Sequence, residues 1–117
     1  MEKLLSVLLH AVNQSHIFHL QTTSYAEHMA LGAFYKDIQT AVDGVAEMYQ
    51  GKYGIAVYKA VNPLENYVNS TQVVNYLVTV AGLIEVTKGN TDSFIANELE
   101  TIEALIYRTI YKIKYLK

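Results

Sequence analysis

The chain contains no cysteine and no tryptophan, and its 117 residues include a single proline, Pro63. Without cysteine it can form neither a disulfide nor a thiolate metal site, so nothing indicates an oxidising compartment. It also lacks any run of about 20 apolar residues of the kind that spans a bilayer. The opening residues do not lead into a signal-peptide cleavage site. We therefore expect a cytoplasmic protein that does not contact membranes.

Charge is scarce as well, because charged residues make up only 17% of the chain and the formal net charge is −2. This balance gives no general attraction to nucleic acid or anionic lipid. Hydrophobic residues make up 51%. That is more apolar surface than a monomer of this size needs, so we expect a homo-oligomer. The length suits a single domain that spans residues 1–117.

Apolar residues recur at spacings of three and four in four segments, which predicts four helices. The predicted helices cover about 2–20, 25–50, 71–88, and about 93 to near the C-terminus. Ser24 and Glu27 form a capping-box pattern at the start of the second helix, and Gly51 and Gly54 mark its end. The third segment is rich in β-branched residues, but about 16 residues is too long for an ordinary strand. Asp92 or a neighbour is expected to cap the fourth helix.

Residues 51–70 interrupt the helical pattern with two glycines and Pro63. We interpret them as a crossover, which could contain a helical turn. Short loops on either side of one long crossover are the connectivity of ferritin-like bundles. The sequence therefore predicts an all-α fold, a ferritin-like four-helix bundle with its crossover between the second and third helices.

Candidate metal ligands lie on the first two predicted helices. One face of the first helix is expected to carry Leu5, Leu8, Leu9, Val12, His16 and His19. The tight turn that follows should bring His19 near His28. Asp43 and Glu47 are four residues apart and share a face of the second helix. Asp43 lies ~22 Å beyond His28 along the axis, whereas ligands of one metal lie within ~2 Å of it. A site that uses all four residues therefore requires two antiparallel copies of the second helix.

The segment HIFHLQTTSYAEHMALGAFYKDIQTAVDGVAEMYQG resembles the helix pair of the Dps family, the miniferritins. The shared pattern is a histidine that ends the first helix, another that opens the next, and then D-x-x-x-E. The resemblance implies an iron-oxidising (ferroxidase) site across a two-fold dimer interface, formed by His19, His28, Asp43 and Glu47. Zinc and manganese also suit such ligands. The chain is similar as well to small uncharacterised proteins of tailed bacteriophages, for which the location would be the host cytoplasm.

Several positions depart from the miniferritin pattern. The usual tryptophan after the first histidine is Leu20, and the turn between the two histidines is shorter. A carboxylate that helps to hold a second iron would fall on Gly32. Glu27 or Asp37 could replace it only if the helix were rotated, and His16 is a further accessory candidate. These departures favour the alternative function, an inactive ferritin-like scaffold that binds a host factor or a small ligand.

The last helix carries Tyr107, Tyr111 and Tyr115 at four-residue spacing, beside Arg108 and Lys112. A basic aromatic surface of this kind can stack on nucleic acid. Such stripes are also typical of amphipathic interfaces, and basic residues in a last turn complement the helix dipole. We interpret these five residues as an interaction surface and do not expect nucleic-acid binding. No phosphate loop, nucleophile elbow or HExxH motif indicates another enzyme class.

Overall fold

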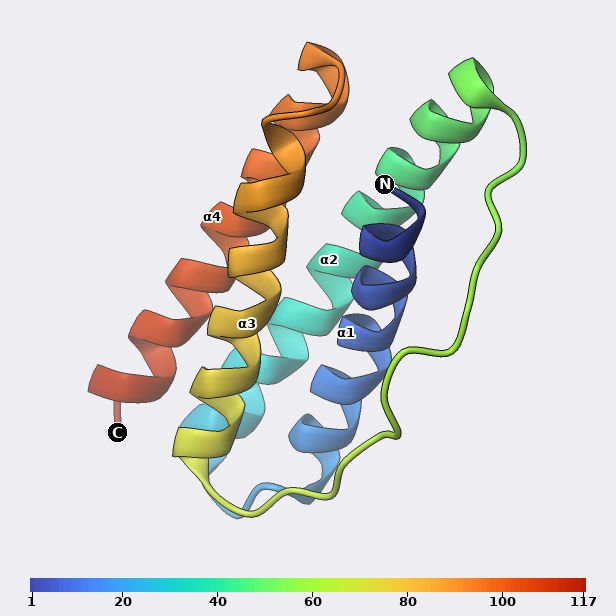
Figure 1. The fold of residues 1–117 in the computed structure, drawn as a ribbon. Coiled ribbons are helices and arrows are strands. Elements are labelled where there is room, and N and C mark those ends of the chain that lie inside the picture. The colour runs from blue at the N-terminus through green and yellow to red at the C-terminus, as the bar shows by residue number, and fades with distance from the viewer.

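The structure, a computed structural model that describes all 117 residues, has four helices and no strand (Figure 1). The helices are α1 (Glu2–Gln21), α2 (Tyr25–Tyr53), α3 (Ser70–Lys88) and α4 (Ser93–Tyr115). All four predicted helices are confirmed, with bounds that differ by at most one turn. No helix combines the length and apolar character needed to cross a membrane.

The helices form a bundle in which α1 packs against α2 and α3, and α4 packs against the same two helices. Figure 1 shows that α1 and α4 run in one direction while α2 and α3 run in the other. Every packed pair is therefore antiparallel. This arrangement requires the connection between α2 and α3 to run the length of the bundle, and it confirms the predicted all-α four-helix fold with a crossover at this point.

The core consists of apolar side chains from all four helices, and the predicted inward faces of α2, α3 and α4 are largely confirmed. The prediction was partly wrong for α1. Its buried stripe contains Leu4, Leu8, Ala11 and Phe18, whereas Leu9 is 41% exposed. Because leucines occur in adjacent pairs, Leu4-Leu5 and Leu8-Leu9, the sequence gives this helix two neighbouring apolar faces. Packing of α1 against both α2 and α3 selects the face that includes Phe18.

Two features of α2 differ in detail from the expected pattern. At its start the Ser24 Oγ accepts a hydrogen bond from the Glu27 backbone N–H at 3.2 Å, as in a capping box. The Glu27 carboxylate instead accepts from the Ser70 hydroxyl at 2.5 Å, which ties α2 to the start of α3. At the other end α2 continues through Gly51 and stops at Gly54, where φ is +93°. Glycine adopts this left-handed conformation without steric cost.

The crossover, residues 54–69, is an uncoiled strap that lies along α1 (Figure 1). It contains no helical turn, so that expectation was wrong. The strap must return the length of α2, whose 29 residues span ~43 Å at 1.5 Å each. Sixteen extended residues reach ~53 Å at most, so the chain has little slack for coiling.

Side chains of α1 hold the strap by its backbone. The bonds run from Val57 N–H to Glu2 Oε2 (2.6 Å), Lys59 N–H to Ser6 Oγ (3.1 Å), Glu65 N–H to Gln14 Oε1 (2.7 Å), Gln14 Nε2 to Glu65 O (2.8 Å), and Tyr67 N–H to Gln21 Oε1 (2.6 Å). An extended chain repeats about every 6.6 Å, and a helix presents the same face about every 6 Å. The two repeats match closely enough for Glu2 and Ser6, one turn apart on α1, to bind the alternate amides of Val57 and Lys59.

Candidate functional site

The structure brings His19 and His28 together across the turn between α1 and α2. The His19 Nδ1 lies 2.7 Å from the His28 carbonyl oxygen, and the His28 Nδ1 lies 2.8 Å from the His19 carbonyl oxygen. Because a carbonyl oxygen can only accept, both Nδ1 atoms carry a hydrogen and donate it. In its neutral form each imidazole therefore keeps a lone pair on Nε2. The rings are stacked, with centroids 3.8 Å apart and an interplanar angle of 17°.

Gly32 makes room for this pair. A Cβ atom at this position would lie 2.8 Å from Cε1 and 3.0 Å from Nδ1 of His19, closer than such atoms approach in proteins. The position where the miniferritin pattern has a carboxylate is thus occupied by the edge of the His19 ring. No side chain fits there while the imidazoles remain stacked.

Aromatic rings extend the histidine pair on both sides. His16 stacks on Tyr35, with centroids 4.1 Å apart, and Tyr35 lies 5.4 Å from the His19 ring. Tyr25 lies 6.4 Å from His28 on the other side. The run from Tyr25 through the two histidines to Tyr35 and His16 follows the seam between α1 and α2. All except the exposed Tyr25 are half-buried.

The carboxylate candidates lie elsewhere. Asp43 and Glu47 are exposed further along α2, and neither makes an ion pair or a side-chain hydrogen bond. Glu27 is buried and faces Ser70. No group of three histidine, aspartate or glutamate side chains within the chain is arranged to hold a metal ion. A site that joins His19 and His28 to Asp43 and Glu47 would need a second copy.

The ring geometry limits how the histidines could bind metal. An ion bound to imidazole lies close to the ring plane, about 2 Å from the nitrogen. The planes of His19 and His28 are nearly parallel and 3.8 Å apart at their centroids. One ion cannot lie in both planes, so this conformation suits two neighbouring ions, one on each ring. A single shared ion would require one ring to rotate and to give up its carbonyl bond.

One protein family has a model that matches residues 19–113, the family of unknown function DUF5856. The chain belongs to this family. The match begins at His19, so the DUF5856 region contains His28, Asp43 and Glu47 together with the strap, α3 and most of α4. No curated protein and no solved structure matches the chain. The resemblance to the miniferritins therefore rests on the residues of the helix pair.

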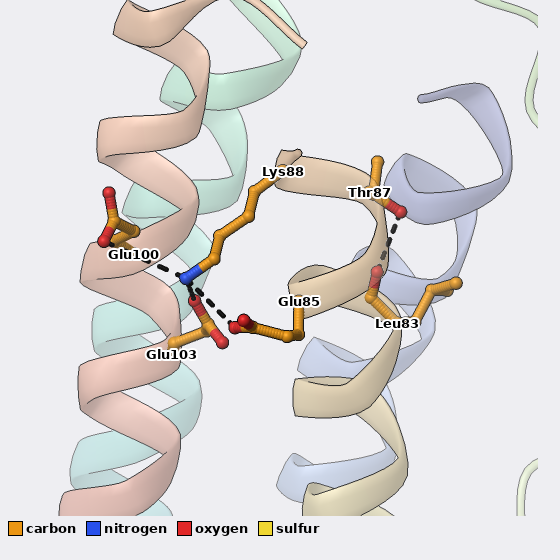
Figure 2. Close-up of polar contacts among 6 residues, drawn as sticks. All are labelled: Leu83, Glu85, Thr87, Lys88, Glu100 and Glu103. Atoms are coloured by element: carbon orange, nitrogen blue, oxygen red, sulfur yellow. Dashed lines mark hydrogen bonds and ion pairs between the residues drawn. The ribbon is translucent and has the colours of Figure 1, made fainter. Parts of the chain in front are cut away.

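At the opposite end of the DUF5856 bundle, ion pairs join the helices. Figure 2 shows Lys88 of α3 between three glutamates, with its Nζ 2.8 Å from Glu103, 3.0 Å from Glu85 and 3.9 Å from Glu100. The hydrogen bond that Lys88 donates to Glu103, with the one that it donates to Glu85, raises the pKa of Lys88. Lys88 in turn lowers the pKa of Glu85. The cluster holds one basic and three acidic side chains, so its lysine is paired and acidic groups are in excess.

Asp92, the residue before α4, belongs to the same end. It occupies the predicted N-cap position but makes no capping hydrogen bond with its side chain. Its carboxylate binds Lys52 Nζ at 3.1 Å and accepts from the Tyr53 hydroxyl at 2.9 Å. The bond from Lys52, followed by that from Tyr53, lowers the pKa of Asp92. The side chain thus fastens the end of α2 to the turn between α3 and α4.

The sequence interpretation did not single out His10. Its Nδ1 lies 2.8 Å from the Tyr76 hydroxyl, while its Nε2 is buried and has no partner. Burial, with a smaller effect of Glu65, raises the pKa of the Tyr76 phenol. Both rings line a cleft of about 560 Å³ between α1, α3 and the strap. Its spacing could have indicated that it faces the strap, because His10 is four residues from both Ser6 and Gln14, which bind the strap.

The predicted interaction surface on α4 is solvent-facing. All five of its residues, Tyr107, Arg108, Tyr111, Lys112 and Tyr115, are exposed. The rings of Tyr111 and Tyr115 lie 5.9 Å apart, and Lys114 lies over Tyr115. None of the five forms an ion pair with another part of the chain.

Proposed function

We propose that this protein is an iron-binding oligomer whose metal site forms at a two-fold interface between copies. The observation that carries the proposal is the reciprocal hydrogen bonding of His19 and His28. Metal-ligating histidines commonly donate their other ring N–H to a backbone carbonyl, which orients the ring and makes the free nitrogen more basic. Both imidazoles are held in this way.

Carboxylates from a second copy would complete the site. Asp43 and Glu47 are exposed, unpaired and on one face of α2. A two-fold axis that sets two α2 helices antiparallel would bring them to the histidines of the other copy. Imidazole nitrogen and carboxylate oxygen without thiolate suit iron, and also zinc or manganese.

The stacking of the two rings supports a pair of ions. With ring planes only 17° from parallel, each imidazole can hold an ion in its own plane, as a two-metal site requires. With iron at both positions the site would have ferroxidase activity, in which Fe(II) gives an electron to oxygen or peroxide. Oxidation of Fe(II) at a two-iron site, as in the miniferritins, is the more specific form of this proposal.

The second candidate function is a scaffold without metal chemistry, and the position of Gly32 favours it. The His19 ring leaves no space there for a third carboxylate. Only Asp43 and Glu47 would then balance the charge of two iron ions. An oligomer that keeps the fold and binds a partner or a small ligand is consistent with this shortage.

Metal titration of the purified protein decides between the two functions. We expect the wild-type protein to bind Fe(II) or Zn(II) stoichiometrically, and Asp43→Ala and His28→Phe to weaken binding at least about tenfold. His28→Phe keeps a stacked ring but removes both nitrogens. Asp37→Ala, which removes another exposed carboxylate of α2, is the matched control and should bind as the wild type does.

Oxygen consumption and oligomeric mass should be recorded in the same samples. Fe(II) oxidation that both site variants abolish would support a ferroxidase. An intact oligomer that binds no metal would contradict the metal proposal and leave the scaffold.

A further inference from the structure

The cleft of about 560 Å³ between α1, α3 and the strap lies apart from the proposed metal site. Sites for small molecules commonly have volumes of this order. The part of its lining that comes from α1 consists of Lys3, Val7 and His10, whereas His19 and His28 do not line it. The cleft is therefore a separate candidate for ligand binding.

The chemistry of the cleft changes along its length. Lys3, Val7 and His10 are spaced by four and three residues, so they share one face of α1. About 10 Å separates the first of them from the last along the helix axis. Because α3 runs antiparallel to α1 (Figure 1), Val80 lies toward the lysine and Tyr76 lies beside His10. The cleft therefore has a cationic end, an apolar middle and a hydrogen-bonding part at the His10–Tyr76 pair.

The His10–Tyr76 pair leaves one buried donor unused. The His10 Nδ1 and the Tyr76 hydroxyl lie 2.8 Å apart. If the phenol donates to Nδ1, only the Nε2 N–H of the neutral imidazole lacks a partner. The reverse assignment leaves both the phenol hydrogen and the Nε2 lone pair without partners, so we assign the imidazole hydrogen to Nε2. Since Nε2 is buried, this N–H is suited to an oxygen acceptor on a ligand.

Lys3 supplies a free positive charge at the other end of the cleft. Its side chain is exposed and forms no ion pair. Glu65 lies beyond His10, where its backbone binds Gln14 and its carboxylate accepts from Gln72 Nε2 at 3.3 Å. A carboxylate on a ligand is attracted by the lysine and repelled by the glutamate. The two charges therefore set the direction in which an anion binds.

We propose that this cleft binds an elongated organic monoanion, whose carboxylate pairs with Lys3 and whose far end offers an oxygen to His10 Nε2. Val7 and Val80 cover the apolar body between these two groups. The probe para-hydroxycinnamate has this pattern, with a carboxylate at one end, a planar apolar body and a hydroxyl at the other end. The proposal does not depend on the proposed metal site.

The strap provides the way into the cleft. Because Nε2 of His10 is buried, a ligand reaches it only when part of the cleft wall shifts. Val61 and Asn62 of the strap line the cleft, and no hydrogen bond holds residues 60–64 to the rest of the chain. This segment is therefore the part of the wall that moves at least cost to admit a ligand.

Calorimetric titration of the metal-free protein tests the class of ligand. We expect para-hydroxycinnamate to bind saturably, and cinnamate, which lacks the hydroxyl, to bind about tenfold more weakly. The alcohol of para-hydroxycinnamate, which lacks the charge, should also bind more weakly. Equal affinities for the three compounds would overturn the inference, and so would the absence of saturable binding up to about 5 mM.

Two matched pairs of variants locate the ligand. Lys3→Gln should weaken binding about fivefold, whereas Lys36→Gln removes an exposed lysine of α2 and should bind as the wild type does. Thr79→Trp places a large ring in the cleft and should block binding, whereas Val78→Trp, on the exposed face of α3 outside the cleft, should not. Circular dichroism should show unchanged helix content in all four variants. If the two members of either pair bind alike, the inference is wrong.

Imidazole NMR of the wild-type protein reports the contact with His10 directly. The Nε2–H signal of His10, assigned by its loss in His10→Phe, should shift with para-hydroxycinnamate and stay unchanged with cinnamate. A shift of the His19 or His28 signals instead would place the ligand at the proposed metal site and overturn the inference. A failure of the metal titration would leave these results unaffected, so the two proposals are tested separately.

Discussion

The two ends of the bundle are closed in different ways. Where α3 turns into α4, charged side chains bind one another: Lys88 lies among three glutamates, and Asp92 binds both Lys52 and Tyr53. Where α1 turns into α2, the histidine rings bind backbone carbonyls and keep a nitrogen free, and one oxygen of the buried Glu27 has no partner. Structural polar groups are normally satisfied. Unused hydrogen-bonding capacity therefore distinguishes the histidine end, where we propose the metal site.

The largest effect on stability is expected when the hydrogen bond from Ser70 of α3 to Glu27 of α2, at the histidine end, is removed. Ser70→Ala removes the one hydrogen bond of the Glu27 carboxylate. Leaving a buried acidic group without a partner should lower the free energy of unfolding by about 1.5–3 kcal/mol, measured by urea denaturation. Ser93→Ala, at an exposed serine without a hydrogen bond, is the control and should stay within about 0.5 kcal/mol of wild type. If both variants changed the free energy of unfolding by similarly small amounts, the Ser70–Glu27 bond would not stabilise the histidine end.

A smaller effect on the free energy of unfolding is expected when either of two glycines in α2 is replaced by alanine, and the two replacements should act in opposite directions. Alanine in place of a helical glycine normally stabilises by about 0.5–1 kcal/mol, and Gly44→Ala should do so because nothing lies near its new Cβ. Gly32→Ala pushes the His19 ring from its position and should cost about 1 kcal/mol net.

Urea unfolding gives the two stabilities, and imidazole NMR signals report whether His19 and His28 still stack. If Gly32→Ala gained as much stability as Gly44→Ala, the position of the His19 ring would not require a glycine at residue 32.

The smallest effect is expected at the charged end and appears only in acid. Lys52 holds the pKa of Asp92 below its ordinary value. On acidification the unfolded chain takes up the proton first, near pH ~3.9, so this contribution is full above that pH and is lost as pH falls toward the lower folded-state pKa. Asp92→Asn should therefore show a shallower loss of Tm with falling pH than the wild-type protein. Asp37→Asn is the control, and a profile equal to that of Asp92→Asn would contradict this assignment.

The fold was largely predictable because three of the four helices carry one apolar stripe each. The stripes through Leu31 and Ile38, Leu77 and Ile84, and Leu99 and Ile106 are all buried. The proximity of His19 and His28 also followed from the sequence, since a short turn joins the two helices. Local spacing fixes these features, so no knowledge of distant contacts is required.

Other features depend on residues far apart in the chain and could not be read from spacing. The partner of Glu27 is Ser70, which comes 43 residues later, and the role of Gly32 depends on the rotamer of His19. The bonds from Gln14 to the Glu65 backbone give no pattern in either segment, because a side chain that binds a backbone group does not constrain the type of its partner. Sequence analysis therefore located the histidine pair but not the bonds that hold it and the strap.

The strap also limits how the chain can change in length. Its amides bind side chains of α1 at Val57 and Lys59, and again at Glu65 and Tyr67. One residue inserted within either stretch would reverse which amides face the helix and undo the bonds beyond it. No bond to α1 holds 60–64, so an inserted residue there could be absorbed as a bulge. The strap thus fixes the number of residues on both sides of 60–64 and tolerates a change in length only within that segment.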